Sequence, residues 1–360
     1  MLNTSIMKQL EIKYPIIQAP MAGGITTSKL VAEVSNYGGL GMIGAGYMSP
    51  DQICTQIREI KQLTNHSFGI NLFVPSEFEV TEDEIMHAKR VMQPHYEQLN
   101  VQINENLEIP YYQQALETFH EQVQVVMEER VSVCSFTFGI PSKEVIENLK
   151  QCGILVIGTA TTVREAIEIE KSGMDMVVVQ GSEAGGHRGN FLEGHKESLV
   201  GLMSLIPQVV DQVAIPVIAA GGIMDGRGVM ASIHLGAEGV QMGTAFLTCV
   251  ESGASDVHRE AILQSHEDQT IFTRSFSGKY ARAIRNTFTL SMQKHEAALP
   301  VFPVQNTLTK GLRQAAKAHN DREHMSLWSG QSPRLAKNQT VHDLMRTIIQ
   351  EVDEIHERLK

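Results

Sequence analysis

The sequence predicts an α/β fold in the form of a (β/α)8 TIM barrel, and three observations support this prediction. Apolar runs of strand length alternate with stretches of helical periodicity, and the alternation occurs eight times. Each apolar run ends in glycine or polar residues, as the strands of a parallel barrel do where they form a site. No G-x-G-x-x-G follows the first run, which argues against the alternative, a doubly wound sheet that binds a dinucleotide.

The predicted strands are short and apolar, and the helices between them carry terminal signals. Ser49 begins a capping box with Gln52, and Thr162 begins a second one with Glu165. Gly153 has the position of a helix C′ residue. Together with the apolar runs, these helix ends place the eight strands at residues 16–20, 40–43, 68–73, 131–136, 154–157, 176–179, 216–220 and 239–244.

Two segments fall outside the alternation. Residues 76–130 are rich in Glu, Gln and His without a clear strand, which predicts a helical insertion after the third strand. Residues 272–335 are locally basic, and we expect them to form helical pieces over the barrel mouth. The predicted division is a barrel domain from residues 1–75 and 131–271, the insertion, and a substrate-side helical segment with a C-terminal helix from residues 272–360.

The last predicted helix carries an apolar stripe. Apolar residues recur at spacings of four and three from Val341 to Leu359, behind Thr340 as the N-cap. The stripe would suit packing on the helix's own domain, which we favour, or the interface of a homodimer.

The composition is that of a soluble globular protein, because 42% of the 360 residues are hydrophobic and 20% are charged. The net charge of −11 argues against a nucleic-acid partner, since such proteins present a basic surface. The four cysteines are far apart, and no metal-binding spacing occurs, so we expect neither a disulfide framework nor a metal. The sequence begins without a leader pattern and has no run of about 18 apolar residues, so we expect a cytoplasmic protein without a membrane partner.

Two glycine loops follow the seventh and eighth strands, where TIM barrels commonly bind phosphate through backbone N–H groups. The first loop spans residues 219–223 and contains Gly221 and Gly222. The second spans residues 241–244, where Thr244 adds a hydroxyl. These loops predict a phosphate-bearing cofactor or substrate, and the alternative is that the glycines only form tight turns.

The loop after the sixth strand, residues 180–189, holds the strongest candidate for catalysis. His187 lies among four glycines just after a buried, valine-rich strand. An imidazole with a pKa of about 6.5 suits a general acid or base. The alternative is a structural or surface histidine. We expect His195, further along the chain, to be a solvated loop residue.

Three polar residues have more than one interpretation. Glu183 could orient His187, bind a cofactor hydroxyl or close its own loop by accepting backbone N–H groups. Arg188 could attract an anionic substrate or form an ion pair. Asn71, in the third strand, could be a strand-end turn residue or an amide that reaches a ligand from the barrel mouth.

Five sequence blocks, taken together and in order, resemble the nitronate monooxygenase family of the class I type, formerly called 2-nitropropane dioxygenase. The resemblance extends over most of the chain, and the Gly-His-Arg-Gly form of the third block is typical of the monooxygenase. The blocks are residues 18–24 (QAPMAGG), 135–141 (SFTFGIP), 180–189 (QGSEAGGHRG), 220–228 (AGGIMDGRG) and 241–246 (QMGTAF).

This resemblance implies an FMN-containing enzyme that oxidises alkyl nitronates with O2 to a carbonyl compound and nitrite. It also implies propionate 3-nitronate, a toxic metabolite, as the physiological substrate, and detoxification as the role. His187 matches the family's active-site histidine. The residues that match FMN contacts are Met21, Ala22, Gly23, Asn71, Gln180, Gly185, Gly222, Gln241, Met242, Gly243 and Thr244.

Within this family we interpret His187 as a protonated or neutral donor to the nitronate oxygens, or as the base that removes the α-proton of a neutral nitroalkane. Three rival functions exist: a flavin-type enoyl-ACP reductase that needs NADH, an NADH:quinone reductase on the same barrel, and a non-enzymatic flavin- or phosphate-binding module. The Gly-His-Arg-Gly form, the insertion and the C-terminal extension argue against the first.

Overall fold

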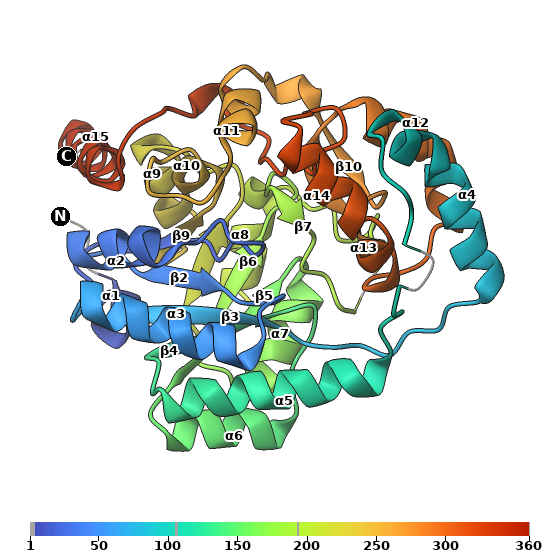
Figure 1. Ribbon diagram of the computed structural model, residues 1–360. Helices are drawn as coiled ribbons and strands as arrows, with labels where there is room; N and C mark the ends of the chain where they lie inside the picture. The colour runs from blue at the N-terminus through green and yellow to red at the C-terminus, as the bar shows by residue number, and fades with distance from the viewer. Residues whose placement is uncertain (1–3, 105–106, 193, 360) are drawn as a thin grey trace.

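Eight parallel strands form a barrel in the computed structural model, which describes residues 4–104, 107–192 and 194–359. The strands neighbour one another in the order β1-β9-β8-β6-β5-β4-β3-β2, and a bridge between Ile17 and Leu40 brings β1 beside β2. The predicted TIM barrel is confirmed (Figure 1). The strands are β1 (Ile16–Gln18), β2 (Gly41–Gly44), β3 (Phe68–Phe73), β4 (Val133–Thr137), β5 (Leu155–Ala160), β6 (Met176–Gln180), β8 (Val217–Ala220) and β9 (Gly239–Met242).

The barrel strands are buried on both faces, which explains their almost continuous apolar sequences. In β6, alternate side chains serve two different cores because successive residues of a strand point to opposite faces. Val177 and Val179 pack in the core shared with the helices. Met176 and Val178 pack in an inner cluster that also contains Ile6, from α1 (Ser5–Gln9).

The helices between the strands follow the predicted terminal signals, with one exception. The capping box of Ser49 and Gln52 is present, and Gly153 has a φ of 75° after its helix. Thr162 accepts from the Glu165 N–H, but the second half of that predicted box is wrong, since the Glu165 carboxylate accepts from Thr161 instead. The barrel helices are α2 (Ser28–Tyr37), α3 (Pro50–Leu63), α5 (Tyr112–Glu128), α6 (Lys143–Gln151), α7 (Val163–Lys171), α8 (Leu202–Val210), α9 (Gly226–His234) and α10 (Thr244–Leu247).

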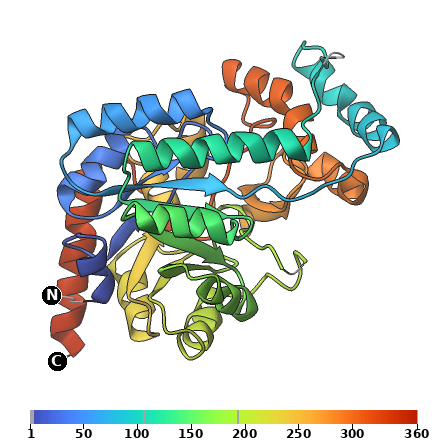
Figure 2. The ribbon, with the colours of Figure 1, turned by 90° about the horizontal axis from the view of Figure 1, so that it is seen from below.

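The segment of residues 76–130 contains two helices with different partners. α5 packs against α3 and β3, as a barrel helix does. α4 (Glu82–Gln98) instead packs against elements from the basic segment near the C-terminus. The two views of the molecule agree that α4 lies at the end of the barrel away from the termini (Figures 1 and 2).

A second hydrophobic core lies in a part of the molecule that we call the cap, defined as α4 together with residues 270–330. Met92 and Tyr96 of α4 pack there with Phe276 and Phe288. Three further helices belong to this region of the chain: α11 (Asp256–Leu263), which packs against η3 (Pro333–Leu335), and η1 (Glu267–Gln269). The cap helices after α4 are α12 (Thr287–Met292), η2 (Gln293–Ala298), α13 (Val304–Leu308) and α14 (Lys310–Ala318).

The cap also contains strands, which the sequence did not predict. β10 (Thr270–Thr273) and β11 (Ala281–Ile284) pair antiparallel, and β11 also pairs with β7 (Gly186–His187) from the loop after β6. The register sets Ala281 opposite His187. This three-stranded sheet fastens the cap to the candidate catalytic loop.

The C-terminal helix α15 (Val341–Leu359) packs on α9 and α2 of its own chain, as favoured from the sequence. The Asp343 N–H donates to Thr340 Oγ1 over 3.0 Å, which confirms the predicted N-cap. Val341, Met345 and Ile348 are buried in the main core. Within the described ranges, every helix is too short or too polar to span a bilayer.

Candidate functional site

One cavity of about 1,040 Å³ lies between the C-terminal ends of the barrel strands and the cap. Small-molecule sites in proteins are commonly of this size or smaller. Both halves of the molecule line it: His187 and the glycine loops from the barrel, and α14 and Trp328 from the cap. The predicted site residues that line the cavity are Met21, Ala22, Gly23, Asn71, Gln180, Gly185, His187, Gly222, Gln241, Gly243 and Thr244.

Met242 is the one predicted site residue that lies apart from the cavity. Its side chain is 1% exposed and packs in the main hydrophobic core. The reason is the alternation along a strand, which turns Gln241 and Met242 to opposite faces. The resemblance matched a continuous run of residues, whereas the side chains of that run divide between the core and the site.

The two glycine loops after β8 and β9 lie at one end of the cavity. Gly221 and Gly222 have φ angles of 134° and 67°, which side-chain-bearing residues rarely adopt. A Cβ on Gly222 would stand 3.1 Å from the Glu183 Cβ. At Gly243, the nearest atom to an added Cβ would be the Ala19 Cβ, at 3.7 Å. The loops thus bring bare backbone to the cavity wall, which is the arrangement that binds phosphate.

The side chains of Gln180 and Arg188 hold the backbone of the loop after β6. Gln180 donates to the His187 carbonyl at 3.0 Å and accepts from the Gly189 N–H at 2.8 Å. Arg188 is fully buried and donates to the carbonyls of Gly181, Gln180 and Ser198. Neither predicted interpretation of Arg188 is correct, because backbone carbonyls rather than a substrate or a carboxylate receive its hydrogen bonds.

Glu183 closes its own loop. Both of its carboxylate oxygens accept from the Leu202 N–H, at 2.9 and 3.0 Å. Leu202 is the first residue of α8, so the carboxylate also lies where the helix dipole favours negative charge. Of the interpretations left open by the sequence, the structure supports backbone capping.

His187 is held in β7 with its imidazole at the cavity wall. Its Nε2 lies 2.8 Å from Ser277 Oγ. The rings of Trp328, Phe138 and Phe302 surround it, with centroids 5.3, 5.8 and 6.2 Å away. The β7–β11 strand pair and the surrounding aromatic rings therefore fix the His187 side chain. The sequence indicated only that the loop is rich in glycine.

The surroundings of His187 favour the neutral imidazole. Burial, and after it the charges of Lys279 and Arg313, lowers the pKa of His187 to about 3. At neutral pH the side chain therefore offers one N–H and one lone pair, rather than the two N–H groups of an imidazolium. Of the two proposed donor forms, the structure favours the neutral one.

Asn71 is the fourth of the six residues of β3 and lines the cavity, as one of its two interpretations requires. Its Nδ2 donates to Ser135 Oγ at 2.9 Å and to Thr137 Oγ1 at 3.0 Å. His195 is half buried rather than solvated, because its ring stacks on Tyr280 at a centroid distance of 3.7 Å. That prediction for His195 was wrong.

Helix α14 brings positive charge to the cap end of the cavity. Lys310, Arg313 and Lys317 recur at helical spacing on one face and line the cavity. Arg313 donates through Nη2 to the carbonyl and side-chain oxygens of Asn306, at 2.8 and 2.9 Å. Three cationic side chains on the wall of the cavity suit an anionic substrate.

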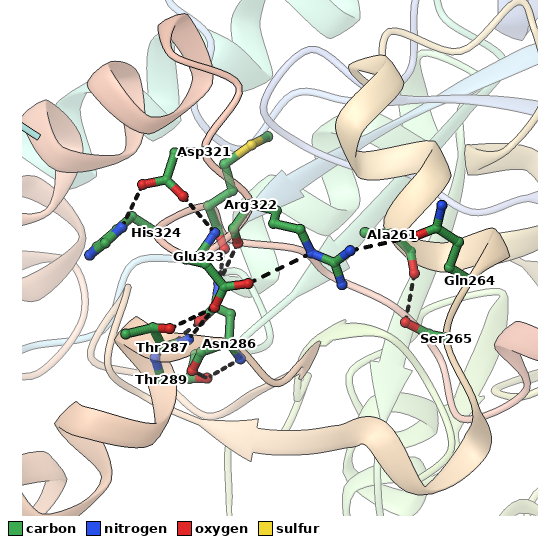
Figure 3. A network of polar contacts seen from close by, with 11 residues as sticks. Ala261, Gln264, Ser265, Asn286, Thr287, Thr289, Asp321, Arg322, Glu323 and His324 are labelled. Carbon is green, nitrogen blue, oxygen red and sulfur yellow. Dashed lines mark hydrogen bonds and ion pairs between the residues drawn. The ribbon is translucent and has the colours of Figure 1, made fainter.

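The segment before Trp328 is anchored by a polar network (Figure 3). Asn286 donates to the carbonyls of Arg322 and Met325, each at 2.9 Å. The Glu323 carboxylate accepts from the N–H and the hydroxyl of Thr287 at 2.9 and 2.7 Å. These bonds tie the segment to the start of α12 and so fix the cap wall that ends in Trp328.

Sequence reasoning missed the aromatic wall, Ser277 and Arg313. Trp328 is the chain's single tryptophan, and Phe138 lies inside one of the recognised blocks, so both offered a signal. Arg313 belongs to the basic segment expected over the barrel mouth, but nothing in the sequence singled it out. Ser277 offered no signal, because it reaches His187 only through the tertiary fold. Among the described residues, no group of three or more His, Cys, Asp or Glu is placed to hold a metal ion.

Comparison with known proteins gives one consistent result. A family model described as nitronate monooxygenase matches residues 3–351. A "Probable nitronate monooxygenase" of Staphylococcus haemolyticus is 52% identical over 352 residues, 97% of each chain. One of Staphylococcus aureus (strain Newman) is 50% identical over 356 residues, also 97% of each chain.

Two solved structures are similar along the whole chain. A nitroalkane oxidase from Streptomyces ansochromogenes superposes with a TM-score of 0.90 at 34% identity, covering 99% of this chain and 100% of that one. FabK from Thermotoga maritima superposes with a TM-score of 0.78 at 32% identity, covering 100% of this chain and 99% of that one. The nitroalkane oxidase has the higher TM-score of the two.

Proposed function

The chain belongs to the nitronate monooxygenase family, a family of flavin-dependent oxidoreductases, and from this premise we propose that its cofactor is FMN and its oxidant O2. The products would be a carbonyl compound and nitrite. The observation that carries the proposal is that glycine loops suited to phosphate and the held imidazole of His187 line the same cavity.

The residues present fit a flavin mononucleotide. The loops at Gly222 and Gly243 offer backbone to one phosphate group, and an added Cβ at Gly222 would crowd Glu183. Met21, Ala22 and Gly23, which follow β1, and Asn71 of β3 would contact the cofactor. When bound, the flavin accepts electrons from the nitronate and delivers them to O2.

The chain's own residues would position the substrate and exclude water. The cationic face of α14 would attract an anionic nitronate toward the cavity. Trp328 and Phe138 would cover the reacting end of the substrate beside His187. His187 would contact the substrate's nitro group or its α-carbon, depending on which ring nitrogen carries the proton.

We propose propionate 3-nitronate as the physiological substrate, with detoxification as the role. Its carboxylate and nitronate groups are both anionic, and Lys310, Arg313 and Lys317 offer several cations along one wall. A cytoplasmic location belongs to the same proposal.

The experiment is a nitrite assay on the purified protein. Added FMN should give a yellow protein that releases nitrite from propionate 3-nitronate in air, with no requirement for NADH. Absence of nitrite from several alkyl nitronates, with flavin bound, would contradict the proposal. Turnover that required NADH would instead favour the enoyl-ACP reductase or NADH:quinone reductase.

A further inference from the structure

The Ser277 hydroxyl links the candidate catalytic histidine to the cap. Ser277 is 1% exposed and does not line the cavity. Its oxygen lies 2.8 Å from His187 Nε2, 2.9 Å from the Lys279 carbonyl oxygen and 3.3 Å from the Lys279 amide nitrogen. Three hydrogen-bond partners therefore share one hydroxyl, and 90 residues of chain separate His187 from it.

Counting hydrogens assigns each of these bonds a direction. A hydroxyl has one proton to donate and two lone pairs that accept. The Lys279 carbonyl can only accept, so it takes the Ser277 proton, and the Lys279 N–H can only donate, so it uses one lone pair. The remaining lone pair can be satisfied only if His187 Nε2 donates. Among the two neutral tautomers, this selects the one with the proton on Nε2.

The other ring nitrogen then faces the ligand. Among the described residues, Nδ1 of His187 has no hydrogen-bond partner, and the imidazole lines the cavity. With Nε2 protonated, Nδ1 presents a lone pair. The cavity side of His187 is therefore an acceptor.

We propose that Ser277 is a positioning residue that fixes His187 in the Nε2–H tautomer, so that Nδ1 serves as an acceptor toward protonated substrates. This inference rests on the proposed function. With a neutral nitroalkane, the α-C–H bond breaks, its proton passes to Nδ1, and the electron pair stays on the substrate as the nitronate. The imidazolium later returns that proton to solvent. A nitronate, which already lacks this proton, does not need the step.

The tautomer can be measured without relying on turnover. In ¹⁵N-histidine-labelled, flavin-loaded protein, long-range ¹H–¹⁵N spectra distinguish the protonated ring nitrogen from the unprotonated one. The His187 signals are identified by their absence in His187→Asn. We expect a protonated Nε2 and an unprotonated Nδ1 at pH 7. A proton on Nδ1, on both nitrogens, or shared between the two tautomers would overturn the inference.

Kinetics distinguish a positioning role of Ser277 from a merely structural one, because only the former affects neutral nitroalkanes more than nitronates. Ser277→Ala should lower kcat for neutral nitroethane about tenfold, the scale seen when a partner that orients an imidazole is lost, with KM little changed. Turnover of ethyl nitronate by the same variant should fall less than about threefold, because no proton is removed. Ser277→Thr, which keeps the hydroxyl, should restore most of the nitroethane rate.

Ser275→Ala is the matched control, since Ser275 is also fully buried in this turn but bonds to Thr273 and Glu296 instead of His187. Ser275→Ala should leave kcat unchanged for both nitroethane and ethyl nitronate. Equal losses on both substrates in Ser277→Ala, or full activity on both, would overturn the positioning role. A wild-type protein that oxidises no nitronate would defeat the proposed function, whereas the spectra would still decide the tautomer.

Discussion

The cavity has a barrel end and a cap end that are built from different parts of the protein. At the barrel end, Gly222 and Gly243 present backbone from two consecutive strand–loop units. At the cap end, side chains form the wall: Trp328 and Arg313 belong to the cap, and His187 comes from the barrel loop that pairs with it, so the three lie far apart in the chain. The barrel end therefore depends on local backbone shape, whereas the cap end depends on tertiary pairing between the barrel and the cap.

The most severe test of the cap end is His187→Asn. If His187 acts on the substrate, nitroethane turnover should fall about 100-fold or more, the contribution of a positioned acid or base, while flavin stays bound. His195→Asn is the control, because that histidine stacks on Tyr280 outside the cavity, and it should lose less than about threefold. Steady-state rates with the flavin absorbance recorded on each sample decide the matter. Near-normal rates in His187→Asn would contradict a catalytic role for His187.

The corresponding test of the barrel end is Gly222→Ala. An alanine here would keep the left-handed backbone conformation of Gly222, which costs about 1–2 kcal/mol. Its methyl group would also crowd Glu183 beside the cavity. Flavin affinity should fall about tenfold or more. Gly153→Ala bears the same conformational strain at φ 75°, with open space around the new Cβ and far from the site, so it should bind flavin normally. Equal affinities in a flavin titration of the two variants would contradict the assignment.

Arg188→Met tests the loop of residues 180–189, which joins the barrel end of the cavity to the cap end. It removes a fully buried guanidinium that serves three carbonyl groups, and each buried group left unpaired costs about 1–3 kcal/mol. We expect the free energy of unfolding to fall by about 3 kcal/mol or more in urea titrations. Arg227→Met, at an exposed arginine paired with Asp225, should leave it nearly unchanged, because solvent screens an exposed ion pair. Similar losses in both variants would refute the anchoring role.

The smallest change we expect is a pH dependence of stability from buried histidines, two of which line the cavity. Burial lowers the pKa of His187 to about 3 and that of His258 to about 4, both below the unfolded value of about 6.5. Between these values the unfolded chain binds more protons than the folded one. The stabilisation is therefore complete above about pH 6.5 and is lost as the pH falls toward 4.

The pH effect can be measured as the difference in unfolding free energy between pH 7 and pH 5. His258→Gln should reduce this difference, whereas His319→Gln, at an exposed position, should leave it unchanged. A stability that rises on acidification over this range would contradict the neutral, buried state of these histidines.

The barrel end of the molecule could be predicted from the sequence in more detail than the cap end. The barrel and its glycine loops follow from short-range patterns, since a valine-rich run such as residues 176–179 and the glycines after it are neighbours in the chain. The β7–β11 pairing joins residues 187 and 281, and no local periodicity encodes such a pair. The division of Gln241 and Met242 between site and core, and the use of Arg188 as a backbone anchor, likewise depend on packing.

The most direct measurement of the central claim is anaerobic reduction of the bound flavin in a stopped-flow instrument. The flavin-loaded protein is mixed with propionate 3-nitronate in one experiment and with NADH in another, and the bleaching of the flavin absorbance is followed. We expect rapid bleaching by the nitronate, slow or no bleaching by NADH, and recovery of the colour when O2 is admitted. Rapid bleaching by NADH together with none by the nitronate would contradict it.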